Sequence, residues 1–244
     1  MRAILTALFG AVLACSLAAC SGGESPEVDA GASQGAAVQS TSAPQPLEIV
    51  EKGWSVDDEG HVTYAAVIRN PNEGWRSEDP RVSVLLKDEN GRVIEDFGES
   101  PSVVGPSQQT VVGGYIGDDR GPVADVEFSI EASGRWVTGE RRFDNLFTVS
   151  SVERGPMPEG YGDGEAFYGT VTRDHYAWES GGTQGAIITV VARDAQGAIV
   201  GGASTYQNDL PLHEAVPFMA DCFIPADGPV SYQAYARPIG YVAG

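Results

Sequence analysis

The chain has 244 residues and carries 34 Asp and Glu against 15 Lys and Arg, so its formal net charge is −19. This excess of acid argues against a nucleic-acid partner, because nucleic-acid-binding proteins neutralise phosphates with clustered Lys and Arg. It also argues against docking on anionic lipid by charge, since that requires a polybasic segment.

The N-terminal segment has the three parts of a secretory signal. Met1-Arg2 supplies a positive charge, an apolar run follows, and Leu17-Ala18-Ala19-Cys20 brings small residues directly after it. The apolar run is shorter than the roughly 20 residues that a membrane-spanning helix needs. We therefore predict a signal peptide over residues 1–19.

Leu17-Ala18-Ala19-Cys20 resembles the lipobox of bacterial lipoproteins. The resemblance implies cleavage before Cys20, acylation of its thiol, and attachment to the outer face of the bacterial cell membrane. Lipid chains hold by apolar burial of about 0.8 kcal/mol per CH₂, so this anchor needs no basic patch. An ordinary secretory signal in which Cys20 is incidental is the alternative.

Residues 20–46 are predicted to form a lipidated Cys20 followed by a disordered linker. The segment after Cys20 contains no aromatic residue and few sizeable apolar ones, so it cannot bury enough surface to offset its ordering entropy. Cys15 leaves with the signal, which leaves Cys222 without an internal disulfide partner in the mature chain. We expect Cys222 to act as a small buried hydrophobe.

From residue 47 onward the pattern is that of β-strands, and no segment keeps a helical period. Residues 125–131 alternate, with apolar side chains on one face and polar ones on the other. Similar sets recur elsewhere, and Ile187–Val191 is a nearly continuous apolar run expected of a central strand. The inward positions are Tyr64, Ala66, Ile68, Val82, Val84, Leu86, Val126, Phe128 and Ile130. Turn residues separate the strands, so we predict an all-β chain of antiparallel sandwiches.

The chain contains the same unit twice. Residues 84–94 align with 190–200, so that Asp88 coincides with Asp194 and each precedes a turn glycine. A Gly-Pro-Val tripeptide follows at a similar distance in both units. A period of about 105 residues is the size of one β-sandwich, so we predict two tandem immunoglobulin-like domains, 47–143 and 144–244.

The first unit also resembles a known family. Residues 62–72 look like a strand ending in an Asn turn, Asp88–Ile94 forms the hairpin, and Val104-Gly105-Pro106 precedes a later strand. This order is similar to the FxLYD-type domains of prokaryotic lipoproteins, although the Phe-x-Leu-Tyr-Asp signature is absent. The resemblance implies an immunoglobulin-like sandwich and a non-catalytic role.

Two aromatic segments are candidate binding surfaces. Trp75 and Arg76 occupy one predicted loop, and Tyr176 and Trp178 occupy the loop at the same position of the second repeat. Trp and Tyr with a neighbouring Arg are typical of recognition hot spots. The alternative is that these aromatic side chains fold back over the sandwich core.

We predict no metal site, no cofactor and no catalytic site. The histidines lack further ligands at zinc spacing, and Asp57-Asp58-Glu59 supplies hard oxygens outside the EF-hand pattern. Neither a Gly-x-Ser-x-Gly elbow nor a Ser-x-x-Lys motif occurs. Gly113-Gly114, Gly181-Gly182 and Gly201-Gly202 lack the features of phosphate loops, and we expect turns or bulges there.

We therefore expect a non-enzymatic surface lipoprotein that presents two immunoglobulin-like domains to an envelope or extracellular protein. One alternative is a module for a small ligand or polysaccharide, which predicts a deep pocket between the sandwiches. The other is an envelope hydrolase, which needs a cleft with two carboxylates of perturbed pKa.

Overall fold

The computed structural model describes residues 43–117, 121–162, 164–176, 185–225, 229 and 231–240. The predicted signal peptide and Cys20 lie outside these residues. The described residues belong to one compact unit, Ser42–Gly244. Within them the chain is all β and contains no helix, which confirms the predicted fold class.

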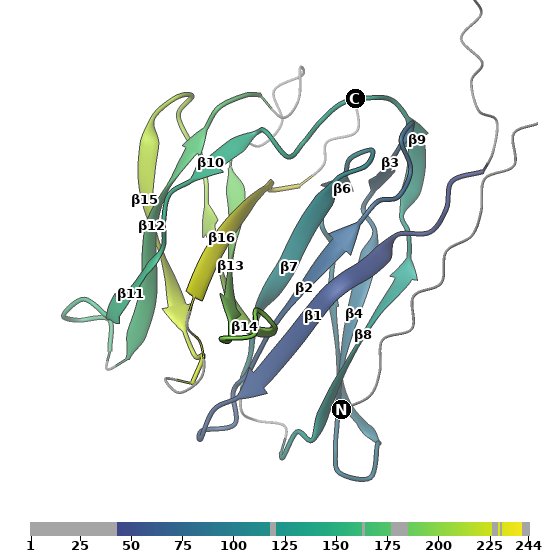
Figure 1. The fold of residues 1–244 in the computed structure, drawn as a ribbon. Coiled ribbons are helices and arrows are strands. Elements are labelled where there is room, and N and C mark those ends of the chain that lie inside the picture. Colours follow the sequence, from purple (N-terminus) through teal and green to yellow (C-terminus); the bar gives the residue numbers. More distant parts are fainter. Residues whose placement is uncertain are drawn as a thin grey trace, which may run out of the picture. The chain divides into compact units, whose positions relative to one another are not determined.

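The described part of the chain forms strands throughout its length (Figure 1). In chain order they are β1 (Glu48–Val56), β2 (Val62–Arg69), β3 (Trp75–Glu78), β4 (Arg81–Lys87), β5 (Val93–Glu99), β6 (Val103–Val104), β7 (Gln109–Ile116), β8 (Asp125–Ala132), β9 (Arg135–Thr138), β10 (Phe147–Val149), β11 (Glu153–Pro156), β12 (Glu165–Arg173), β13 (Ala186–Arg193), β14 (Ile199–Gln207), β15 (Ala215–Cys222) and β16 (Ser231–Pro238).

The sheet topology repeats along the chain. In the first half, residues 47–143, the sheets are β1-β2-β7 and β5-β4-β8, with a small sheet β6-β3-β9 beside them. In the second half, from residue 144 onward, the order β14-β13-β16 matches β5-β4-β8, and β12 lies between β15 and the pair β10 and β11. These strands pair antiparallel, as expected for β-sandwiches.

The two aligned hairpins have the same turn geometry. In β4–β5, Asp88 Oδ1 accepts the backbone N–H groups of Asn90 and Arg92, at 2.9 Å each. In β13–β14, Asp194 Oδ1 accepts those of Gln196 and Ala198, at 2.9 and 2.8 Å. Each turn glycine has a positive φ, and each hairpin has a register shift beside the turn. The sequence alignment of these two segments is therefore matched residue by residue in the structure.

Two hydrophobic cores follow from the alternating strands. Side chains of β2, β4 and β8 fill the first core, including all the inward positions expected from the sequence. Side chains of β12, β13 and β15 fill the second core, around Phe167 and Ile188. A third cluster, formed by Ala65, Val67, Val111, Val191 and Ile199, joins the outer faces of β2 and β7 to those of β13 and β14. Strand β2 is consequently buried on both faces.

At this third cluster, glycine residues let β14 lie close to β2. Gly113 lies inside β7 and pairs with Ala65 of β2 without a register shift, so the predicted turn or bulge at this position is wrong. Gly201-Gly202 lies inside β14, where a bulge precedes Gly201, and forms no turn. A Cβ on Gly202 would lie 2.5 Å from the Tyr64 carbonyl oxygen, which explains the small residue. Gly181-Gly182 lies outside the described residues.

The segments beside the predicted domain boundaries are packed. Phe143 and Leu146 are buried with Val103, so the connection between the halves is part of the core. The last residues of the predicted linker, 43–46, are described, and Gln45 exchanges two 2.8 Å hydrogen bonds with the side chain of Asn72. The boundary at 143/144 stays a prediction.

Candidate ligand-binding cavity

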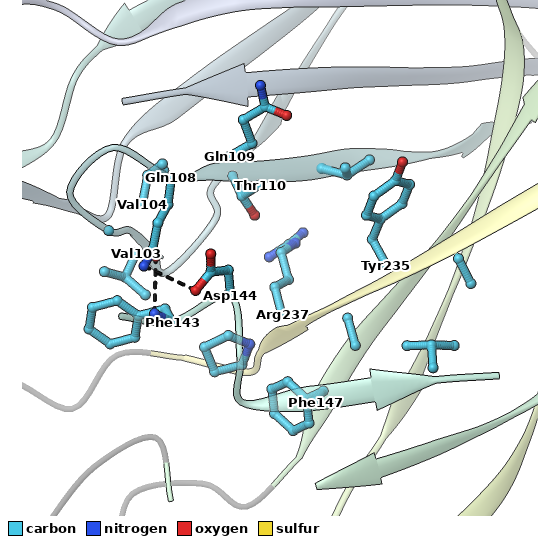
Figure 2. A pocket seen from close by; sticks show the side chains of 16 residues that line it. Val103, Val104, Gln108, Gln109, Thr110, Phe143, Asp144, Phe147, Tyr235 and Arg237 are labelled. Carbon is cyan, nitrogen blue, oxygen red and sulfur yellow. Dashed lines mark hydrogen bonds between the residues drawn. The ribbon is translucent and has the colours of Figure 1, made fainter. Parts of the chain in front are cut away.

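A cavity of about 170 Å³ lies where residues of the two halves meet (Figure 2). The connection between β6 and β7 and the start of β7 line it from the first half. The segment from Phe143 to Val149 and the end of β16 complete its walls. Its lining combines aromatic side chains, Phe143, Phe147 and Tyr235, with the polar side chains of Gln108, Gln109, Thr110, Asp144 and Arg237. Both halves are needed to form it.

Two buried amides hold the wall that carries Gln109 and Thr110. The side-chain Nδ2 of Asn70, at the end of β2, donates to the carbonyls of Val104 and Gly105 at 3.1 and 3.0 Å. Gln108 joins the halves, because its Oε1 accepts the Phe143 N–H at 3.0 Å and its Nε2 donates to Asp144 Oδ1 at 3.2 Å. A buried amide with both ends satisfied fixes the direction of its segment.

Arg237 enters the cavity region from β16. Its side chain is 11% exposed, and its Nη2 donates to Glu99 Oε2 at 3.0 Å. The other Glu99 oxygen accepts the Tyr64 hydroxyl at 2.8 Å. Burial raises the pKa of the Glu99 carboxyl, while Arg237, Tyr64 and the Gly113 N–H act in the opposite direction. Burial and Glu99 also raise the pKa of Tyr64. Arg237 Nε and Nη1 are buried and have no hydrogen-bond partner among the described residues.

A wider hollow of about 410 Å³ adjoins the cavity and shares Gln108, Gln109, Val111, Asp144 and Tyr235 with it. It extends to Arg193, whose Nη1 lies 2.6 Å from Glu51 Oε2 of β1. Arg69 also lines it and pairs with Glu48. Three arginines therefore lie along this junction in a chain with few basic residues.

The sequence-predicted binding residues lie elsewhere. Trp75 and Arg76 form part of β3 rather than a loop, and both are half-buried. Arg76 Nε donates to Glu78 Oε1 at 2.8 Å, and Glu78 is 1% exposed, so this arginine balances a buried carboxylate.

Tyr176 is exposed. Its ring lies 5.0 Å from the Arg173 guanidinium carbon, and its carbonyl accepts the Arg141 Nη2–H at 3.0 Å. Trp178 and Cys20 lie outside the described residues. The structure therefore tests neither the pairing of the two aromatic segments nor the lipidation of Cys20.

One group of metal-ligating side chains forms in the β1–β2 turn. The Asp57 Oδ2 and Glu59 Oε2 atoms lie 2.8 and 3.8 Å from His61 Nδ1, although the sequence suggested no partner for this histidine. Asp57 also accepts the backbone N–H groups of Glu59 and His61 at 3.0 and 2.8 Å. The His61 hydrogen bonds lower the Asp57 pKa against the opposing effect of burial. Hydrogen bonding within the turn accounts for this arrangement.

Sequence reasoning missed the cavity residues. Arg237 occupies the outward face of an alternating strand, where a charged residue normally indicates contact with solvent. Only the packing of one half against the other converts that face into an interior surface.

Comparisons with family models, curated proteins and solved structures found no match to this chain. The resemblance to FxLYD-type domains therefore rests on the sequence features alone. Among the described residues, no helix is long and apolar enough to cross a membrane. The protein is thus all β, with a small and partly open cavity at the junction of its two halves.

Proposed function

We propose that the protein is a lipid-anchored, non-catalytic lipoprotein that binds a small ligand in the junction cavity. The observation that carries this proposal is the cavity, whose walls come from both halves. A pocket between the sandwiches distinguishes ligand binding from simple presentation of loops, and the observed cavity is smaller and more open than the deep pocket expected for a binding module. The absence of a recognisable nucleophile motif in the sequence supports a binding role.

Ligand screening on the full-length protein in detergent tests the binding role. NMR spectra of the backbone amides should show chemical-shift changes confined to cavity residues such as Thr110 and Tyr235 when a ligand is added. Gln109→Trp should abolish these chemical-shift changes, because Gln109 is exposed and lines both the cavity and the wider hollow. Gln233→Trp is the matched control, because Gln233 is an exposed residue of β16 that lines neither the cavity nor the wider hollow. A broad small-molecule screen without cavity shifts would contradict the binding role.

The proposed anchor is Cys20, placed on the outer face of the bacterial cell membrane. Cys20→Ser should move the protein from the membrane fraction to the soluble fraction, because acyl chains supply the membrane affinity. Cys222→Ser is the control, since the Cys222 side chain is partly buried in the second core and should not affect fractionation. Membrane retention of the Cys20→Ser protein would remove the anchor from the proposal.

A protein partner in the envelope or outside the cell is a second candidate. Exposed Tyr176 supports it, because Arg173 and Arg141 hold this aromatic residue at the surface. Tyr176→Ala should reduce crosslinking of the membrane-bound protein to its neighbours, whereas exposed Tyr161→Ala should not. Unchanged crosslinking in Tyr176→Ala would rule out this surface.

A further inference from the structure

We propose that the ligand of the junction cavity is a small organic anion, a monocarboxylate of about one ring in size, and that Arg237 is its counter-ion. This inference rests on the proposed function, because it specifies which chemistry the same cavity selects.

The guanidinium of Arg237 has incomplete hydrogen bonding. Buried polar groups are nearly always hydrogen-bonded, and a buried charge without partners is costly. Arg237 uses Nη2 for Glu99, whereas Nε and Nη1 are buried without a partner in the part of the chain that the structure describes. Figure 2 shows the Arg237 side chain reaching between Thr110, Asp144 and Tyr235. Both nitrogens lie beneath the surface of the cavity, so a bound acceptor reaches them after a shift of the guanidinium and then completes its hydrogen bonding.

The carboxylates near Arg237 already have hydrogen-bond donors of their own. Asp144 is the acidic residue of the small cavity, and Arg142 Nε donates to its Oδ1 at 3.0 Å, so this carboxylate is already paired. Glu99 also receives hydrogen bonds from Tyr64 and the Gly113 backbone. Among the described residues that line the cavity, Arg237 is thus a buried cation with hydrogen-bonding capacity left over. A carboxylate matches it better than a neutral ligand, because charge-assisted hydrogen bonds are roughly twice as strong as neutral ones.

The size and the lining of the cavity limit which ligands fit it. The cavity holds about 170 Å³, close to an engineered apolar cavity of about 150 Å³ that binds benzene. Phe143 and Phe147 supply an aromatic wall beside the polar groups. A single ring, or an aliphatic chain of similar volume, carrying one carboxylate fits both the volume and the two kinds of lining.

Titration calorimetry with two probes tests the proposal on the full-length protein in detergent. Benzoate and benzamide have nearly the same shape, and only benzoate is charged. We expect benzoate to bind at least tenfold more tightly than benzamide. Arg237→Met should reduce this preference to less than threefold, whereas Arg81→Met should preserve it, because Arg81 pairs with Glu131 on the surface.

The comparison in the unaltered protein decides the proposal even if Arg237→Met fails to fold. Equal binding of the two probes would overturn the anion assignment and leave the binding role intact. Failure of both probes to bind, while the NMR ligand screen finds another ligand in the cavity, would overturn the anion assignment alone. Failure of both probes together with an empty screen would overturn the binding role as well.

Discussion

Glu99 links the two halves through a single carboxylate. Its oxygens accept hydrogen bonds from Tyr64 in β2 and Arg237 in β16, which are far apart in the sequence. Desolvation of this carboxyl outweighs its partners, so its pKa is raised in the folded protein. The folded state therefore binds a proton more readily than the unfolded chain does.

This shift predicts a signature in the pH dependence of stability. Wild-type stability relative to Glu99→Gln should fall as pH rises from about 4.3, the pKa of an unfolded glutamate, through the raised folded pKa. Denaturant unfolding at several pH values measures the difference.

Glu127→Gln is the control, because the Lys87 hydrogen bond lowers the Glu127 pKa and gives the opposite slope below about pH 4.3. A stability difference between wild type and Glu99→Gln that stays constant from about pH 4.3 upward would contradict the raised pKa of Glu99.

Site residues were harder to predict than strands. Trp75 follows Pro71 and Gly74, which are typical of a loop, yet pairing with β9 places it in a strand. No sequence motif marks Arg237 as a site residue, because its position depends on Glu99, which lies more than a hundred positions earlier in the chain. The partner of His61 depends on the β1–β2 turn, which brings Asp57 to its ring.

At the scale of elements, the alternation of apolar residues predicted which side chains enter each core. Tyr64, Val84 and Phe128 all lie in the first core, as expected. The same pattern did not reveal that β2 and β13 are buried on their second faces. Continuous apolar runs such as Ile187–Val191 are consistent with burial on both faces, but they do not identify the partner. Here the partner is the other half of the chain.

The contact between β1 and β14 predicts a sensitive position. A Cβ on Gly53 would overlap the carbonyl oxygen of Ile199, so Gly53→Ala must push the strands apart. We expect a loss of about 1–3 kcal/mol in the free energy of unfolding, which is typical of overpacking. Gly74→Ala is the control, because nothing lies within 4 Å of the added carbon. Equal stability of the two variants in denaturant unfolding would refute this view of the contact.

At the scale of the whole molecule, the two halves share too much buried surface to unfold independently. The cluster of Ala65, Val67 and Val191 lies between them, and the buried Ser102 hydroxyl donates to the Pro238 carbonyl at 2.8 Å. Differential scanning calorimetry of the full-length protein should therefore show one cooperative transition. Two separate transitions would mean that the halves behave as independent domains.

The central prediction is that the junction cavity binds a small organic anion. A crystal structure of the full-length protein grown with saturating benzoate provides the decisive measurement. We predict benzoate in the cavity, with its carboxylate within hydrogen-bond distance of Arg237 and its ring against Phe143. A cavity that holds only water under these conditions would contradict the assignment of an anionic ligand.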